Sequence, residues 1–286
     1  MTDNKWNVFP HTSSEYNYEG DALKANWEQL HLGNKELYPS EDRVKQLCTT
    51  YSALKQSLPH EEMAKIAEDL QQAWRLYHRG EYQQAYEMGI SLGVIGYLVA
   101  SRSQSMYAYY LEDNESRKRS FSKEAADRAE EMFAIMPKYA NAYFINAYAL
   151  GRYSQSISVI KALAQGLGGK IKNSAEKAIK FEPNHAEAHL ALGTYHSEVI
   201  DKVGSVVAGL TYGAKKDIGI DHFEKALKVA PETPSTHIEY ANGLLMLFGK
   251  KKLKEATQAY EKAAELKPFD ATQRLDVELA KSELAD

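Results

Sequence analysis

The sequence predicts an all-α fold made of repeated pairs of helices, and three observations support this. Four segments of the C-terminal half show the three- and four-residue apolar spacing of amphipathic helices and end in a proline, which stops a helix. A Leu-x3-Trp-x3-His-x-Gly pattern around Trp27 returns around Trp74. The sequence has no alternating polar and apolar run bounded by hairpin turns. The closing prolines are Pro137, Pro183, Pro231 and Pro268.

The composition narrows the class of protein. With 286 residues, of which 44% are hydrophobic and 26% charged, the chain has the composition of a soluble folded protein. Its formal charge of −4 comes from well-mixed acidic and basic residues, which argues against nucleic acid as a partner. The single cysteine, Cys48, permits no intrachain disulfide, so a reducing compartment is expected. The first residues carry no secretion signal, which predicts a cytoplasmic protein, or a periplasmic one if a signal has been removed. No apolar stretch reaches the ~20 residues of a membrane span.

The N-terminal half is predicted to begin with an irregular arm over residues 1–20 and to continue over 21–136 as divergent helical repeats. Gly80 is expected to separate a helix over 61–79 from its partner over 82–91, because glycine tolerates the left-handed backbone that ends helices. The next expected elements are a long helix over 93–111, a charged loop over 112–120, and a helix capped by Ser122 that ends at Pro137.

The C-terminal half, residues 137–270, shows the repeat most clearly. The run that contains His189, Leu192 and Gly193 is followed by Gly219, Phe223, Ala226 and Pro231, and the whole resembles a tetratricopeptide repeat. In that repeat, small residues let paired helices approach closely, and aromatic rings fill the space between them. The resemblance implies a right-handed α-solenoid. A last helix over 271–286, with Ala271, Leu275 and Leu279 on one side, is expected to cap it.

Two of the repeats exceed the usual tetratricopeptide length of about 34 residues. The additional residues lie at 154–169 and 201–214, between the two helices of a repeat, and both insertions are apolar and rich in small residues. Such extended repeats resemble the tetratricopeptide domain of the regulator-of-microtubule-dynamics family and its bacterial relatives. That resemblance implies a helical module with an adaptor-like role and no catalytic residues.

Several patterns that resemble catalytic or metal-binding motifs have simpler structural interpretations. His185, His189 and His196 have helical spacing suited to a metal, but they do not form His-Glu-x-x-His. His185 is instead predicted to lie in the turn between repeats, and His189 to pack in the first helix. The glycines of 166–169 lack the preceding strand and the Lys-Ser/Thr pair of a phosphate loop. Cys48 has no basic neighbourhood that would activate its thiol. The sequence therefore predicts a protein that is not an enzyme and binds no metal or cofactor.

The leading prediction is a protein or peptide partner, bound in the concave groove that the first helices of the repeats form. In solenoids these helices line the inner face, and their side chains contact the partner. The carboxylate clamp of some tetratricopeptide proteins is absent, because its positions hold residues such as Tyr148, Ala191 and Glu239. The predicted groove residues are Asn141, Tyr148, Arg152, Glu187, Thr194, Glu198, Glu239, Asn242 and Met246.

The two insertions allow three interpretations. A cavity beneath them would bind an apolar small molecule or lipid, close packing would make them additional core, and exposure would make them an interface in a homo-oligomer. Additional core is favoured over the cavity. The side chains that would line such a cavity are Ile160, Leu163, Val206, Val207 and Leu210.

Overall fold

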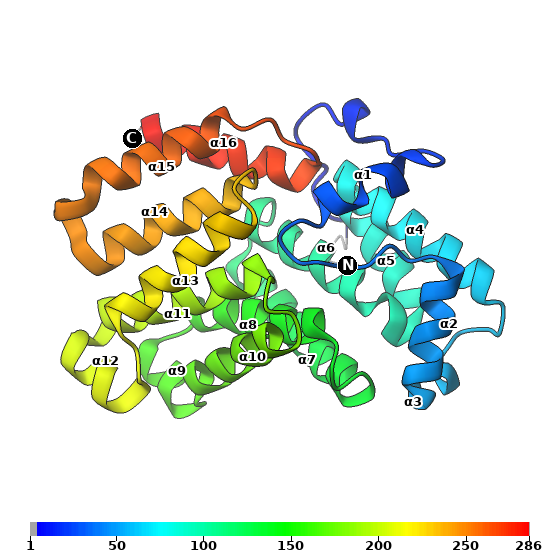
Figure 1. The fold of residues 1–286 in the computed structure, drawn as a ribbon, viewed down its shortest axis with the longest axis horizontal. Coiled ribbons are helices and arrows are strands. Elements are labelled where there is room, and N and C mark those ends of the chain that lie inside the picture. Colours follow the sequence, from blue (N-terminus) through cyan, green and yellow to red (C-terminus); the bar gives the residue numbers. More distant parts are fainter. Residues whose placement is uncertain (1–4, 286) are drawn as a thin grey trace. The chain divides into compact units, whose positions relative to one another are not determined.

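The computed structural model describes residues 5–285, except for the side chains of 159, 160 and 163. The described residues form helices and loops without a β-strand, which confirms the predicted all-α class (Figure 1). None of the described helices combines the length and the apolar character needed to cross a bilayer. The chain divides into two compact units. Unit 1 comprises Met1–Leu30, Glu36–Ser156 and Asp270–Thr272, and unit 2 comprises His31–Lys35, Ile157–Phe269 and Gln273–Asp286.

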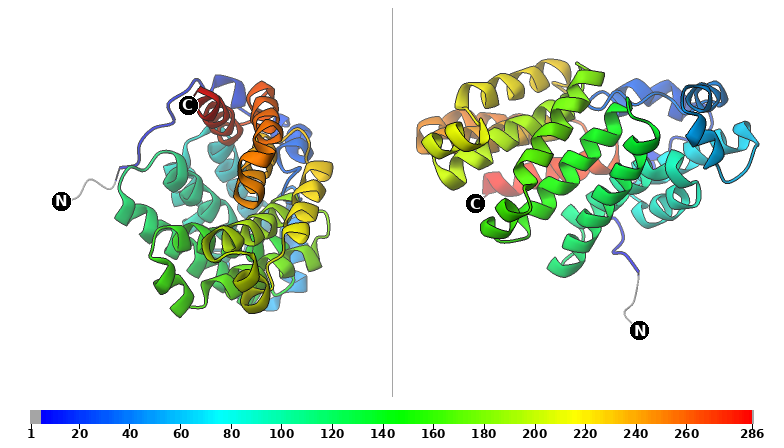
Figure 2. Two further views of the ribbon diagram at one scale, coloured as in Figure 1. Left: turned by 90° about the vertical axis from the view of Figure 1, so that its left-hand side faces the viewer. Right: turned by 90° about the horizontal axis from the view of Figure 1, so that it is seen from below.

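In unit 1, each helix from α4 to α8 packs against the next one along the chain (Figure 2). The elements of unit 1 are η1 (Ser14–Tyr16), α1 (Ala22–Leu30), α2 (Glu41–Thr50), α3 (Ser52–Gln56), α4 (Met63–Arg79), α5 (Tyr82–Ser91), η2 (Gly93–Gly96), α6 (Tyr97–Tyr110), α7 (Glu115–Ile135) and α8 (Ala140–Gln155).

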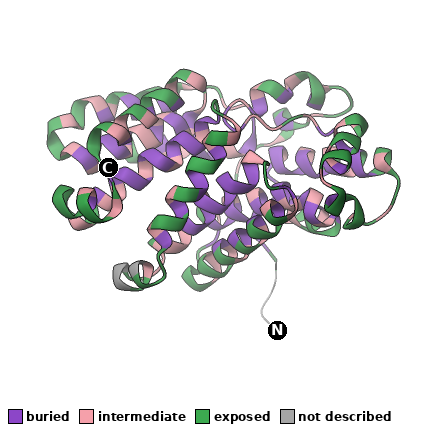
Figure 3. Ribbon diagram, turned by 60° about the horizontal axis from the view of Figure 1, so that its bottom comes forward, coloured by how far each residue is buried: buried purple, intermediate pink, exposed green. Residues whose placement is uncertain are grey.

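In unit 2, the hairpins α10–α11, α13–α14 and α14–α15 form a stack, and α11 also packs against both α13 and α14. Their buried residues lie on the faces turned toward neighbouring helices (Figure 3). The elements of unit 2 are α9 (Val159–Ala164), α10 (Leu167–Phe181), α11 (Ala186–Val203), α12 (Ser205–Tyr212), α13 (Lys216–Val229), α14 (Pro234–Phe248), η3 (Gly249–Lys252), α15 (Leu253–Glu265) and, from Gln273 onward, α16 (Ala271–Ala285).

The helix boundaries of unit 1 show one success and one error of the sequence analysis. Gly80 ends α4 with a φ of +85°, and α5 begins two residues later, as expected. The predicted loop over 112–120 and the Ser122 cap are wrong. Helix α7 already starts at Glu115, because the Asn114 side chain accepts hydrogen bonds from the backbone N–H groups of residues 116 and 117. Ser122 lies inside α7 and donates to the Lys118 carbonyl.

The closing prolines have a second function in the structure. Three of the four prolines accept a hydrogen bond at their carbonyl oxygen from the side chain six residues later, in the first turn of the next helix. Tyr143 Oη donates to Pro137 O at 3.1 Å, His189 Nε2 lies 3.1 Å from Pro183 O, and His237 Nε2 lies 2.7 Å from Pro231 O. Each of these three prolines therefore ends one helix and fixes the start of the following one.

In unit 2, one phenylalanine packs between two glycines of neighbouring helices. Phe223 of α13 is 0% exposed. A Cβ atom on Gly193 of α11 would lie 2.8 Å from the Phe223 ring, and one on Gly243 of α14 would lie 2.6 Å from its Cζ. The close helix approach predicted at Gly193 is thus present, and the ring occupies the space that two missing side chains leave.

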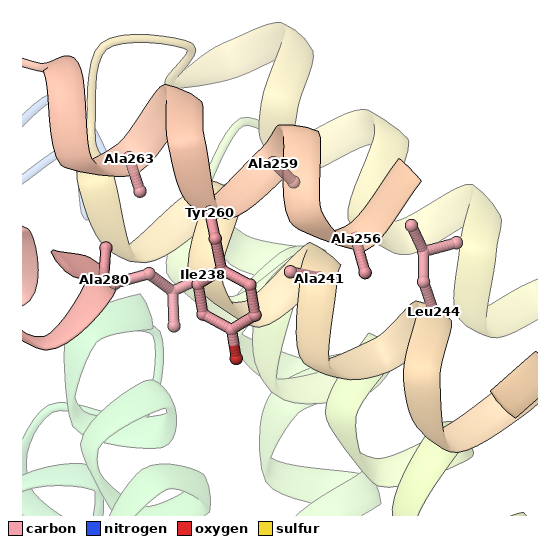
Figure 4. Packing of buried hydrophobic residues seen from close by; sticks show 8 residues of the cluster. All are labelled: Ile238, Ala241, Leu244, Ala256, Ala259, Tyr260, Ala263 and Ala280. Carbon is pink, nitrogen blue, oxygen red and sulfur yellow. The ribbon is translucent and has the colours of Figure 1, made fainter. Parts of the chain in front are cut away.

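Helix α16 completes the hydrophobic cluster of α14 and α15. Ala280 of α16 packs with Ile238 and Tyr260, as Figure 4 shows. Leu275 is buried, as expected for the apolar side of this helix. Val277 is also buried, so the buried side of α16 extends beyond the predicted stripe of Ala271, Leu275 and Leu279.

Truncation after Pro268 should lower the melting temperature and cause self-association, because it uncovers the part of the α14–α15 cluster on which Ala280 packs. Thermal unfolding and light scattering coupled to size exclusion would measure both effects. Truncation after Lys281 is the matched control, since residues 282–285 are exposed and their removal should leave both quantities unchanged. A monomeric protein with the wild-type melting temperature after the longer truncation would contradict the covering role of α16.

Candidate partner-binding surface

Helices α11 and α14 present the clearest candidate surface within unit 2. Both are first helices of their repeats, and they pack against each other. Helical spacing places three predicted residues of each on one face, and Thr194 Oγ1 of α11 donates to Glu239 Oε2 of α14 at 3.0 Å. This α11–α14 face comprises Glu187, Thr194, Glu198, Glu239, Asn242 and Met246, all half-buried.

Neighbouring residues hold several of these side chains in place. The Asn34 amide of the 31–35 segment donates to Glu187 Oε1 at 3.4 Å, and the Glu187 N–H donates to the Gly33 carbonyl at 3.1 Å. At the other end of α11, Glu198 pairs with Lys202 at 3.5 Å. Tyr260 of α15 donates to Asn242 Oδ1 at 2.5 Å. The α11–α14 face is therefore partly fixed before any partner arrives, which lowers the entropy cost of binding.

The charge of the α11–α14 face is negative. Glu187, Glu198 and Glu239 contribute three carboxylates, and Lys202 pairs with Glu198. Complementary charge favours a partner segment that carries lysine or arginine, and it disfavours an acidic one.

In unit 1, the structure corrects one of the three predicted groove residues. Asn141 of α8 is buried, and its amide donates to Glu36 Oε2 at 2.7 Å, so it serves the interior and not an open groove. Tyr148 and Arg152 are half-buried. The Arg152 guanidinium lies 3.9 Å from the ring centroid of Tyr109 and 5.1 Å from that of Tyr148, which is a cation–π arrangement.

The partner of Asn141 belongs to a buried polar cluster that the sequence analysis missed. Tyr139 and Asn141 both donate to Glu36 Oε2, although Glu36 precedes both residues by about 100 positions in the chain. Burial raises the pKa of the Glu36 carboxyl, against the opposing effect of the two hydrogen bonds. The cluster borders a cavity of about 30 Å³, room for one or two water molecules. The lining of the cavity is otherwise mainly apolar and includes Trp74 and Leu98.

The predicted cavity under the insertions is not supported by the side chains that the structure describes. Val206, Val207 and Leu210 are exposed to solvent, because α12 is short and turns only Ala208 inward. They therefore line no cavity, and the favoured interpretation of Val207 as additional core is also wrong. The side chains of Ile160 and Leu163 lie outside the described part of the structure.

His189, His196 and His222 of unit 2 form a cluster. Because a carbonyl oxygen can only accept, neutral His189 carries its proton on Nε2 toward Pro183 O, and its Nδ1 then accepts from His222 Nδ1 at 2.8 Å. His196 Nδ1 accepts from the Lys215 N–H, and its ring stacks on that of His222. Burial lowers the pKa of His189, and it lowers those of His196 and His222 to about 4. Within residues 5–285, no group of three or more His, Cys, Asp or Glu residues is arranged to hold a metal ion.

Comparison with known proteins connects this structure to one family. The family model described as "Regulator of microtubule dynamics protein 1-3" matches residues 69–284. The fold is similar to the crystal structure of TTC0263, a thermophilic TPR (tetratricopeptide repeat) protein of Thermus thermophilus, with a TM-score of 0.55 and 19% sequence identity. That match covers 76% of this chain and 99% of the other, and it confirms the tetratricopeptide-like fold. No curated protein sequence matches the chain.

Proposed function

The chain belongs to the regulator of microtubule dynamics protein 1-3 family, and from this premise we propose that it is a non-catalytic adaptor that binds a basic protein segment on the α11–α14 face. Tetratricopeptide-like folds generally serve as scaffolds for protein interactions, which supports this class of function. The observation that supports the basic partner is the set of three carboxylates on two adjacent first helices, two of which are positioned by Asn34 and Thr194.

Selection from a random peptide library on the full chain would test the proposal. We expect the selected peptides to be enriched in lysine and arginine. Their affinity, measured by fluorescence anisotropy, should fall about tenfold in the double variant Glu187→Gln with Glu239→Gln, which removes two charges and keeps the shape of both side chains. The affinity should also decrease as salt is added, because the interaction is between opposite charges.

The matched control is Glu224→Gln with Glu261→Gln, which removes two exposed charges from the second helices α13 and α15. This control should bind as the wild type does. The predicted contribution of α8 is measured in the same way with Tyr148→Ala and Arg152→Ala. Selected peptides without basic enrichment, or equal loss of affinity in the control and in the Glu187/Glu239 variant, would contradict the proposed α11–α14 face.

A further inference from the structure

Helix α12 exposes apolar side chains that the rest of unit 2 leaves uncovered. Val206 is 74% exposed, Val207 47% and Leu210 85%. Their spacing of one and three residues places them on one face of the helix, opposite the buried Ala208. Gly204 and Gly213 at its two ends have φ values of +79° and +63°, which glycine adopts most readily. Two glycine-based turns therefore set α12 apart from α11 and α13, with its apolar face outward.

Every charged residue within 156–172 and 202–216 is a lysine, and Asp201 and Asp217 border the second segment. Residues 156–172 contain Lys161, Lys170 and Lys172, and residues 202–216 contain Lys202, Lys215 and Lys216, while neither segment contains Asp or Glu. Because the whole chain has a formal charge of −4, the remaining residues carry −10. Lys172 pairs with Glu176, Lys202 pairs with Glu198, and Lys216 donates to the Leu247 carbonyl. The exposed Lys161, Lys170 and Lys215 therefore supply the positive charge beside the exposed apolar residues.

Contacts within unit 2 bring the two insertions together. Tyr195 donates to the Tyr212 carbonyl at the end of α12 at 3.0 Å, and its ring lies 3.5 Å from where a Cβ of Gly168 would be, at the start of α10. Lys172 Nζ lies 3.4 Å from the corresponding position of Gly213. Helices α9 and α12 therefore belong to the same end of unit 2 (Figure 1). The insertion surface at this end comprises Lys170, Lys172, Lys202, Val206, Leu210 and Lys215.

We propose that the insertion surface docks on an anionic lipid bilayer. A short helix with an outward apolar face and flanking lysines suits the membrane interface, where apolar side chains enter the headgroup region and lysines meet lipid phosphates. A second copy of the chain fits the same surface poorly. A symmetric dimer would place identical surfaces against each other, and its lysines would repel those of the other copy. Charge complementarity therefore selects the bilayer as the occupant.

Flotation of the full chain with vesicles tests this proposal. We expect little binding to phosphatidylcholine vesicles and clear binding when about a third of the lipid is phosphatidylglycerol. Leu210→Glu should reduce the bound fraction about tenfold. Leu253→Glu is the matched control, because Leu253 is 52% exposed on α15, outside the insertion surface, and this variant should bind as the wild type does. Circular dichroism verifies that both variants are folded.

A second pair of variants tests the role of charge. Lys170→Gln with Lys215→Gln should weaken binding to the anionic vesicles, whereas Lys228→Gln with Lys254→Gln, on the exposed parts of α13 and α15, should not. A Leu210→Trp variant should shift its fluorescence to shorter wavelength on the anionic vesicles, since the indole leaves water.

Three outcomes would overturn the proposal. The first is equal binding of Leu210→Glu and Leu253→Glu to anionic vesicles, and the second is an unshifted fluorescence spectrum of the Leu210→Trp variant when that variant is bound to vesicles. The third is a wild-type dimer, seen by light scattering, that Leu210→Glu dissociates while neither protein binds vesicles. The last result would assign the insertion surface to a second copy of the chain.

Discussion

Replacing Gly243 by alanine is expected to destabilise unit 2 by about 2–3 kcal/mol, although alanine is the better helix former. A Cβ at this position in α14 would lie 2.6 Å from Phe223 Cζ, well inside van der Waals contact. The ring cannot move away from Gly243, because Gly193 leaves no free space on its other side. The expected loss therefore exceeds the gain of ~1 kcal/mol that helix propensity would provide.

Denaturant unfolding followed by circular dichroism measures this loss of stability. Gly193→Leu should behave in the same way, since its side chain would meet the same ring from α11. Gly209→Ala in α12 is the matched control, because the nearest heavy atom to its new Cβ is the Ala214 carbonyl at an ordinary 3.8 Å. If Gly243→Ala unfolds at the wild-type denaturant concentration or above, the ring has room to move and the predicted close packing is wrong.

Lowering the pH from 6.5 toward 4 should destabilise unit 2 by several kcal/mol. Burial lowers the pKa of His196 and of His222 to about 4, so the unfolded chain binds more protons than the folded chain between pH 4 and 6.5. Stability therefore falls as the pH decreases through this window, by on the order of 3 kcal/mol for His196 alone. Lys172 and Lys225 act in the same direction, whereas the Asp217 carboxylate opposes the shift at His196.

The hydrogen bonds of the histidine cluster give the physical reason for this loss. His196 Nδ1 accepts from the Lys215 N–H, so protonation of His196 would set two N–H groups against each other. The melting temperature, measured at constant ionic strength, should be nearly constant above pH 7 and decline below 6.5. His222→Gln should reduce the decline, whereas His11→Gln, a control in the N-terminal segment, should not. A melting temperature independent of pH between 6.5 and 4.5 would contradict the neutral cluster.

The sequence predicted best those features that depend on local chemistry. The prolines at 183 and 231 each follow the last residue of a helix by two positions, because proline cannot continue the backbone hydrogen bonding. Gly80 was identified as a helix end for a similarly local reason, its tolerance of positive φ. Gly193 was placed at a helix crossing because the repeat pattern itself encodes the alternation of small residues and rings.

Features that depend on distant residues were not predictable. The pairing of Asn141 with Glu36 joins positions 105 residues apart, and the contact of His189 with His222 joins positions 33 apart, and neither has a sequence signal. The exposure of Val206 and Leu210 was one of three interpretations and not the favoured one, for a different reason. An apolar helix of eight residues contains too few polar positions to show which of its faces is outward.

The hydrogen bonds from Tyr143, His189 and His237 to the preceding prolines have a consequence for the kinetics of folding. Each joins two residues only six positions apart, so its loop closes at a small entropic cost before distant helices meet. Chains in which most contacts join residues close in sequence fold fast. Stacked repeats can start to fold at several points along the chain. The order in which the repeats form is then set by the local stability of each junction and not by its distance from either end of the chain.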